Sequence, residues 1–216
     1  MRKLLVVAGL ALLFPVAASA GSNLGVKLGL AFPGGEAYQG AAMSDTIAMA
    51  IPVEVSANFG LSPQLDVGVY LGYAFVQPDA DFVDYCNFYG GSCEEHLWRF
   101  GVKSEFALGS SGQGFSPFVG ANFGFEWDVL NQDLPDLGDD YTYTLRGWEL
   151  GFELGADAWM SQTSKLGAFV GLSFGEYNWE HANGTIGGVS GDASGSFSDT
   201  AMHSWFTVGV RGSFGM

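Results

Sequence analysis

The sequence predicts an all-β protein: an eight-stranded antiparallel up-and-down transmembrane β-barrel. Three observations support this fold class. Eight segments alternate apolar and polar residues with the period of two that a strand imposes. The connections between these segments are alternately short and long. The amino terminus carries an export leader, and 33 glycines with 15% aromatic residues favour strands and turns over helices.

The first 20 residues have the three parts of a secretory signal peptide. Two cations precede an apolar run over residues 4–16, and Ala18-Ser19-Ala20 supplies a small-residue cleavage site. The run is shorter than the roughly 20 residues that a membrane-spanning helix needs. We therefore expect a signal peptide at residues 1–20 and one barrel domain at residues 21–216.

Charge and cysteine content narrow the class of protein further. Removing Arg2 and Lys3 with the leader leaves six cations against 23 acids, a formal charge of −17, which argues against a nucleic-acid partner. Cys86 and Cys93 are the only cysteines. In an exported chain this spacing predicts a disulfide that closes a small loop, because the compartment is oxidising. A metal site there would need more ligands than His96 alone.

The alternation is clearest in RGWELGFELGAD, at residues 146–157. As a strand, this segment places Trp148 and Leu150 on an apolar face and its three acids on the other. As a helix, each of its glycines would cost about 1 kcal/mol relative to alanine. The same test along the chain gives eight strands, at residues 24–32, 46–60, 65–76, 96–108, 115–129, 146–157, 166–177 and 202–215.

The second of these segments contains a local flaw. Its alternation assigns Ile47, Met49 and Val53 to the apolar face and Glu54 to the polar face. Pro52 cannot donate a hydrogen bond to a neighbouring strand, so we expect the ladder to be weakened there.

The connections alternate in length along the whole chain. Short polar turns cover residues 61–64, 109–114 and 159–165, whereas long connections cover residues 33–45, 77–95, 130–143 and 178–201. Short turns at one end and long loops at the other are typical of bacterial outer-membrane barrels, with the turns in the periplasm. An even number of strands puts both chain ends on the periplasmic side. The last long connection is rich in Gly and Ser, so we expect it to be a mobile loop.

The apolar face is expected to point outward, into lipid. A soluble eight-stranded barrel such as a lipocalin would turn this face inward around a ligand. Here aromatic residues lie near both ends of the apolar stripes, as membrane interfaces favour. The belt at the loop end comprises Tyr73, Phe75, Trp98, Phe125, Trp127 and Trp148, and the belt at the turn end comprises Phe59, Phe106, Phe115 and Phe214.

The polar face is therefore expected to line a narrow lumen that side chains fill. Buried charges must be paired, so the sequence predicts an ion-pair network that plugs the barrel. Its expected members are Lys27, Glu54, Asp66, Arg99, Lys103, Glu105, Glu126, Glu149, Glu153, Asp157 and Arg211, with Asp128 on the same face. Lys27 and Arg211 lie on the first and last strands, and their expected partners are Glu54, Asp66, Glu105 and Asp157.

In these features the chain resembles the small outer-membrane β-barrel family that includes the OmpA transmembrane domain and OmpX. Members usually end in a strand with a terminal aromatic residue that the barrel-assembly machinery reads. Here the last strand is WFTVGVRGSFGM, and Phe214 lies two residues before Met216. The resemblance implies an outer-membrane location, a monomer without a cofactor, and membrane lipid, lipopolysaccharide and the assembly machinery as partners.

Two kinds of barrel enzyme of this size, a lipid A deacylase and a lipid A palmitoyltransferase, need a serine and a histidine that share a proton. The only adjacent pair is His203-Ser204, and neighbouring strand residues point to opposite faces. His181 and His96 lie in or beside loops without a suitably spaced serine. We therefore expect no enzyme.

The long connections carry acids and no Lys or Arg. These acids are Glu36, Asp45, Asp79, Asp81, Asp84, Glu94, Glu95, Asp133, Asp136, Asp139, Asp140, Glu180, Asp192 and Asp199. They indicate either solvated, mutually repelling loops or weak Ca²⁺ or Mg²⁺ binding that ties the rim to lipopolysaccharide. The sequence thus predicts a non-enzymatic barrel for envelope structure or surface interaction. A narrow porin-like channel for small solutes is the alternative.

Overall fold

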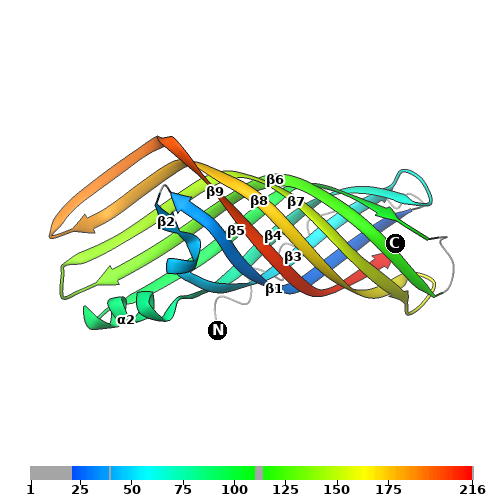
Figure 1. The fold of residues 1–216 in the computed structure, drawn as a ribbon, viewed down its shortest axis with the longest axis horizontal. Helices are drawn as coiled ribbons and strands as arrows, with labels where there is room; N and C mark the ends of the chain where they lie inside the picture. The colour runs from blue at the N-terminus through cyan, green and yellow to red at the C-terminus, as the bar shows by residue number, and fades with distance from the viewer. Residues whose placement is uncertain (1–20, 39, 110–113, 216) are drawn as a thin grey trace.

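The computed structural model describes residues 21–38, 40–109 and 114–215 (Figure 1). The predicted signal peptide at residues 1–20 and the terminal Met216 lie outside the described residues. Eight long antiparallel strands pair in chain order, and the last strand pairs with the first, so the sheet closes into a ring. The predicted fold class is confirmed.

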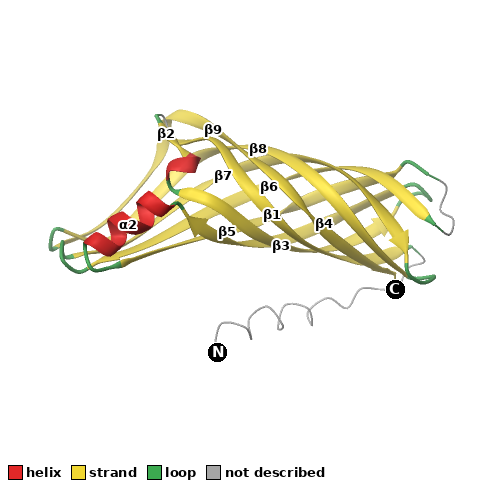
Figure 2. Ribbon diagram, turned by 60° about the horizontal axis from the view of Figure 1, so that its bottom comes forward, coloured by secondary structure: helices red, strands yellow, loops and turns green. Residues whose placement is uncertain are grey.

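The ring is built from strands that are longer than the sequence predicts. Their bounds are β1 (Ser22–Tyr38), β3 (Ile47–Gly60), β4 (Leu65–Pro78), β5 (Ser92–Ala107), β6 (Phe115–Leu134), β7 (Asp139–Trp159), β8 (Ser164–Ile186) and β9 (Val189–Gly215). Three short elements lie at the loop end, namely β2 (Ala41–Ala42), the 3-10 helix η1 (Met43–Asp45) and α2 (Ala80–Phe88) (Figure 2). In the described part of the chain, each helix is too short or too polar to cross a bilayer.

The register of the ring staggers the strands. A row of directly paired residues that starts at Lys27 on β1 and crosses each neighbouring strand in turn reaches β9 at Ala201, whereas Lys27 itself pairs with Arg211. This offset tilts the strands relative to the barrel axis, as closure of a sheet requires. Asn23 pairs with Gly215, so both ends of the described chain lie at the turn end.

Two of the predicted long loops are mostly strand. The hairpins β6–β7 and β8–β9 continue past the ring and project from the loop end (Figure 1). The predicted loops at residues 130–143 and 178–201, including the Gly/Ser-rich segment, were therefore wrong as loops. Both faces of these extensions contain polar residues and glycine, so the apolar alternation that identifies a half-buried strand is missing although the backbone ladder continues.

The apolar face of the ring points outward, as predicted. Val69, Val102 and Leu154 are 46%, 56% and 58% exposed, and aromatic residues of both belts are exposed near the strand ends. The predicted turn at residues 61–64 joins β3 to β4. The ladder between β1 and β3 skips the positions around Pro52, where the missing N–H was expected to weaken it.

The predicted outward position of Ile47 was wrong. The pairing of β3 with β4 shifts by one residue between Ile47 and Met49, and a one-residue shift reverses the face to which a side chain points. Ile47 instead packs in the lumen with Met43 of η1, Leu97 and Trp205, all of them 0–1% exposed. This apolar cluster lies toward the loop end of the lumen.

Gly124 in the lumen makes room for the Tyr70 hydroxyl, and it gives a direct test. A Cβ atom at Gly124 would lie 2.3 Å from the Tyr70 hydroxyl and 2.5 Å from the backbone oxygen of Phe100. We expect Gly124→Ala to lower the free energy of unfolding by about 1–3 kcal/mol, measured by urea unfolding in lipid vesicles.

Gly191→Ala is the matched control, because a Cβ atom there would meet nothing within 4 Å. Equal unfolding free energies for the two variants would contradict the close approach of Tyr70 to Gly124.

Candidate functional site

The inward face of β5 orders the lumen from the turn end to the loop end. It supplies Glu105, Lys103, Arg99, Leu97 and Glu95 in that order, each two or four residues from the next. The first three belong to three ion-pair groups. We call these the Arg211 group, the lysine group and the Arg99 group.

The Arg211 group lies nearest the turn end. The guanidinium of Arg211 donates from Nε to Asp157 at 2.8 Å and from Nη2 to Asp157 at 2.7 Å and to Glu105 at 2.6 Å. The Cζ atom of this guanidinium lies 3.6 Å from the ring centroid of Phe118. Arg211 is thus held by two carboxylates and one aromatic face, and it is only 7% exposed.

The lysine group joins four charged residues from four strands. Lys103 Nζ lies 3.0 Å from Glu54 and 3.9 Å from Glu153. Lys27 Nζ lies 3.4 Å from Glu54 and also forms an ion pair with Glu153. Each ammonium therefore contacts both carboxylates, and the group has no net charge.

The Arg99 group lies on the turn side of the apolar cluster. Arg99 contacts Glu126 at 2.6 Å and Glu149 at 3.3 Å. Glu126 also accepts a hydrogen bond from the Tyr177 hydroxyl, and its Oε1 lies 3.1 Å from His203 Nε2. Glu149 accepts a hydrogen bond from Ser173 at 2.9 Å.

One predicted partner and one predicted placement of an acid were wrong. Asp66 was expected to pair with Lys27 or Arg211, but its carboxylate accepts a hydrogen bond from Asn23 at 3.3 Å and forms no ion pair within the described residues. Glu95 was expected on an exposed loop, but β5 begins earlier than predicted and places it inward, 5% exposed. Asp128 on the next strand is also buried, at 6% exposure.

The charged groups leave little empty space between them. A cavity of about 80 Å³ lies between the lysine group and the Arg99 group, and one of about 20 Å³ lies between the lysine group and the Arg211 group. A water molecule occupies about 30 Å³ in the liquid, so the larger cavity has the size of a few waters.

The histidines lie apart from possible nucleophiles. His203 points into the lumen and stacks on Tyr177 at 4.2 Å, whereas Ser204 lies on the opposite face of β9. His96 contacts the Tyr73 hydroxyl at 2.8 Å, and His181 lies 3.8 Å from Asp192. In the described part of the chain, no three His, Cys, Asp or Glu residues gather as metal ligands would.

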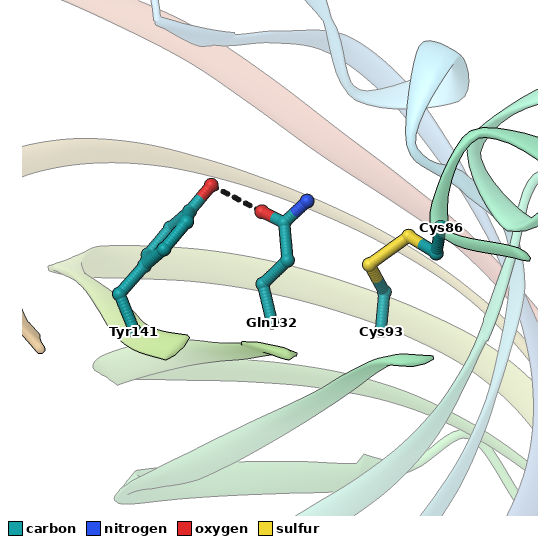
Figure 3. The surroundings of a disulfide bond; sticks show 4 residues. All are labelled: Cys86, Cys93, Gln132 and Tyr141. Atoms are coloured by element: carbon teal, nitrogen blue, oxygen red, sulfur yellow. Dashed lines mark hydrogen bonds between the residues drawn. A yellow bond between two sulfur atoms is a disulfide. The ribbon is translucent and has the colours of Figure 1, made fainter. Parts of the chain in front are cut away.

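The predicted disulfide between Cys86 and Cys93 is present and joins α2 to β5 (Figure 3). The Cα atoms lie 6.1 Å apart, within the usual range. The helix begins after Asp79, whose side chain accepts a hydrogen bond from the backbone of Asp81 at 3.0 Å. The bond thus fixes a capped helix over the loop end of the ring.

A second contact near the disulfide ties β6 to β7. The Tyr141 hydroxyl donates a hydrogen bond to the side-chain oxygen of Gln132 (Figure 3). Partial burial raises the pKa of the Tyr141 phenol, because the ionised form would lose hydration. The hydroxyl therefore remains a donor at neutral pH.

Sequence reasoning missed the neutral residues that complete the lumen. Tyr177 and Ser173 donate to Glu126 and Glu149, and Met43 enters from a segment that the sequence assigns to a loop. Tyr177 and Ser173 do share the inward face of their predicted strand, so alternation places them correctly. The entry of Met43 has no signal in the strand pattern.

The closed ring, outward apolar face and charged interior define the fold of the small outer-membrane β-barrels. Neisserial surface protein A is similar, with a TM-score of 0.56 and 14% identity over 91% of this chain and 98% of that one. OprG from Pseudomonas aeruginosa is similar with a TM-score of 0.53 and 13% identity, over 91% of this chain and 97% of OprG. A major outer membrane protein from Thermus thermophilus has a TM-score of 0.51 and 14% identity, over 90% of this chain and 100% of that protein.

No protein-family model matches the sequence, and no curated protein matches it. At these identities the solved structures define the fold, whereas the role of the chain must be argued from its own residues.

The Arg211 group gives a direct test of the ion pairs. We expect Arg211→Gln to lower the free energy of unfolding by about 3–5 kcal/mol, because it leaves Glu105 and Asp157 buried without a cation. Urea unfolding in lipid vesicles, followed by tryptophan fluorescence, measures the loss.

Asp66→Asn is the control, since Asp66 forms no ion pair among the described residues, and we expect a change below about 1 kcal/mol. Adding Glu105→Gln and Asp157→Asn to Arg211→Gln should restore part of the stability. An Arg211→Gln variant as stable as the unchanged protein would show that these contacts do not balance buried charge.

Proposed function

We propose that the chain is a non-enzymatic integral protein of a bacterial outer membrane, whose barrel anchors acidic loops on the cell surface for envelope structure or surface interaction. One observation carries this proposal. Every strand presents exposed apolar side chains on the outward face of the ring, and the Lys–Glu, Arg–Glu and Arg–Asp ion pairs lie inside.

The exposed apolar face is too extensive for a protein in water. Soluble monomers rarely expose a continuous apolar patch larger than a few hundred Å². Here exposed Leu, Val and Phe side chains follow all eight strands between the two aromatic belts, including Leu28, Val55, Val69, Val102, Phe123, Leu154, Val170 and Val208. Hydrocarbon chains remove this surface from water, and the belts lie at the headgroups.

The contents of the lumen favour an anchoring role and argue against a channel. Three ion-pair groups and the apolar cluster around Met43 occupy successive levels of the barrel. A hydrated solute would have to separate buried ion pairs to pass. A channel for small solutes is therefore the less favoured function.

The geometry also favours a non-enzymatic role. His203 is buried against Glu126 and Tyr177, and its neighbour Ser204 lies on the other face of the strand. A substrate in the membrane would reach one of the two residues but not both.

The partners proposed for this anchor follow from its surfaces. Membrane lipid covers the apolar face, and the barrel-assembly machinery inserts the chain. The acidic hairpins and α2 lie where lipopolysaccharide surrounds the barrel. We propose a monomer without a cofactor.

Spin labels test the orientation of the two faces. Labels at Val69 and Val170 are expected to be accessible to oxygen dissolved in lipid and protected from a water-soluble nickel complex, because both side chains point outward between the belts. A label at Gly191, on the projecting β8–β9 hairpin, should show the reverse. Water contact at Val69 and Val170 would rule out the membrane orientation.

Planar-bilayer recordings test the closed lumen. We expect no steady openings from the folded protein, because the ion-pair groups and the apolar cluster fill the interior. Heat-modifiable gel migration of the same sample verifies that the barrel is folded. Steady openings of large size from a folded sample would favour the channel over the anchor.

A further inference from the structure

We propose that Arg146 binds the phosphate group of an anionic lipid in the leaflet that surrounds the loop end of the barrel. This inference rests on the proposed function, because it requires the ring to lie in a membrane. It adds a specific lipid contact on the outer surface, apart from the charges of the lumen.

Arg146 differs in position from the other cations. The described residues contain six Lys and Arg residues, of which Lys27, Arg99, Lys103 and Arg211 form ion pairs inside the lumen. Lys165 pairs with Trp159 at the turn end. Arg146 is exposed on the outer surface near the loop end, and within the described residues it is the only cation there.

Two tryptophans hold the guanidinium of Arg146. Trp127 on β6 and Trp179 on β8 are its direct cross-strand partners. The guanidinium carbon, Cζ, lies 4.2 Å from the ring centroid of Trp179 and 5.9 Å from that of Trp127. Cation–π contacts of this kind orient a guanidinium without using its N–H groups.

The donors of Arg146 remain available for a ligand. Among the described residues, its guanidinium forms neither an ion pair nor a hydrogen bond, whereas Arg99 and Arg211 each contact two carboxylates. A planar guanidinium with five N–H donors matches the oxygens of a phosphate, which accept two parallel hydrogen bonds. The ligand that completes this site is therefore an oxyanion.

A β-bulge builds one side of the site. Gly147 pairs with Tyr177 and Arg146 pairs with Trp179, so Asn178 is an extra residue in β8. Without it, the alternation that points Tyr177 inward would also point Trp179 inward. The bulge instead turns Trp179 to the outer surface beside Arg146. Bulges commonly change the direction in which a side chain points in this way.

The depth of the site fits a lipid phosphate. Trp148 of the loop-end belt lies two residues from Arg146 on the same face of β7, toward the turn end. Two residues of a strand span about 7 Å, so Arg146 lies just beyond the hydrocarbon boundary, at headgroup level. A phosphate carried by a lipid is concentrated at this depth, whereas inorganic phosphate is not.

The surroundings of Arg146 are acidic. The chain without its leader has a formal charge of −17, and its acidic hairpins repel anionic lipids. Glu176, the cross-strand partner of Trp148, faces the same surface and repels a phosphate on the turn side of Arg146. A bound phosphate therefore has to approach Arg146 from the loop side of Trp148.

The test measures lipid binding to the full folded protein by native mass spectrometry from detergent micelles. The probes are lipid A with two phosphates, the same lipid A after removal of both phosphates, and inorganic phosphate. We expect Arg146→Gln to weaken binding of phosphorylated lipid A about tenfold, as loss of a charge-assisted bidentate contact predicts. Dephosphorylated lipid A should bind equally to both proteins.

Controls separate this site from general electrostatics. Lys165→Gln removes a cation that also lies over an indole ring, at 4.4 Å, but at the turn end, and should leave binding unchanged. Arg146→Lys should retain part of the affinity. Millimolar inorganic phosphate should not displace the lipid, and displacement would overturn the assignment to a lipid phosphate.

Equal binding of phosphorylated lipid A to Arg146→Gln and to the unchanged protein would overturn the inference. This failure is distinct from failure of the proposed function. In the first case the protein shows heat-modifiable migration and lipid-exposed labels at Val69 and Val170, and in the second case it shows neither.

Discussion

The structure depends on the closure of β1 against β9, because closure creates a narrow lumen in which each Lys and Arg is held by carboxylates from other strands. Lys27 and Arg211 become cross-strand neighbours only in the closed ring. Once closed, the ring places each of them against carboxylates from strands far away in the sequence, such as Glu153 for Lys27 and Glu105 for Arg211. An open sheet would expose the same residues to water, where such pairs contribute little.

Closure also explains why the interior mixes charges with glycine and aromatic rings. Eight strands leave an interior just wide enough for side chains to fill. Tyr70 of β4 reaches over Gly101 of β5, its cross-strand partner, to β6, where its hydroxyl lies against Gly124 and accepts a hydrogen bond from Asn122. Where Arg211 and Lys27 enter, Phe118 and Phe169 offer aromatic faces to them. Apart from the cluster around Met43, the lumen is thus a core in which ion pairs and rings take the place of aliphatic side chains.

Alternation predicted the ring well, since one face of each strand meets a uniform apolar surrounding. It assigned most charged lumen residues to the inner face, although spacing alone did not give their partners, as Asp66 shows. Alternation failed where the direction of a side chain, or the extent of a strand, does not depend on contact with an apolar surrounding. A register shift turned Ile47 inward, and polar hairpins outside the membrane continued as strands without an apolar face. A bulge, or a loop segment such as η1 that packs into the lumen, produces no periodic pattern of apolar residues in the sequence.

The disulfide has a consequence for the order in which the protein matures. Cys86 and Cys93 are separated by seven positions, and their bond joins α2 to the adjacent start of β5, so it needs no contact from the rest of the ring. In the proposed topology it can close in the periplasm before the strands assemble. The segment between strands β4 and β5 would then cross the membrane as a covalently closed loop and not as an extended chain.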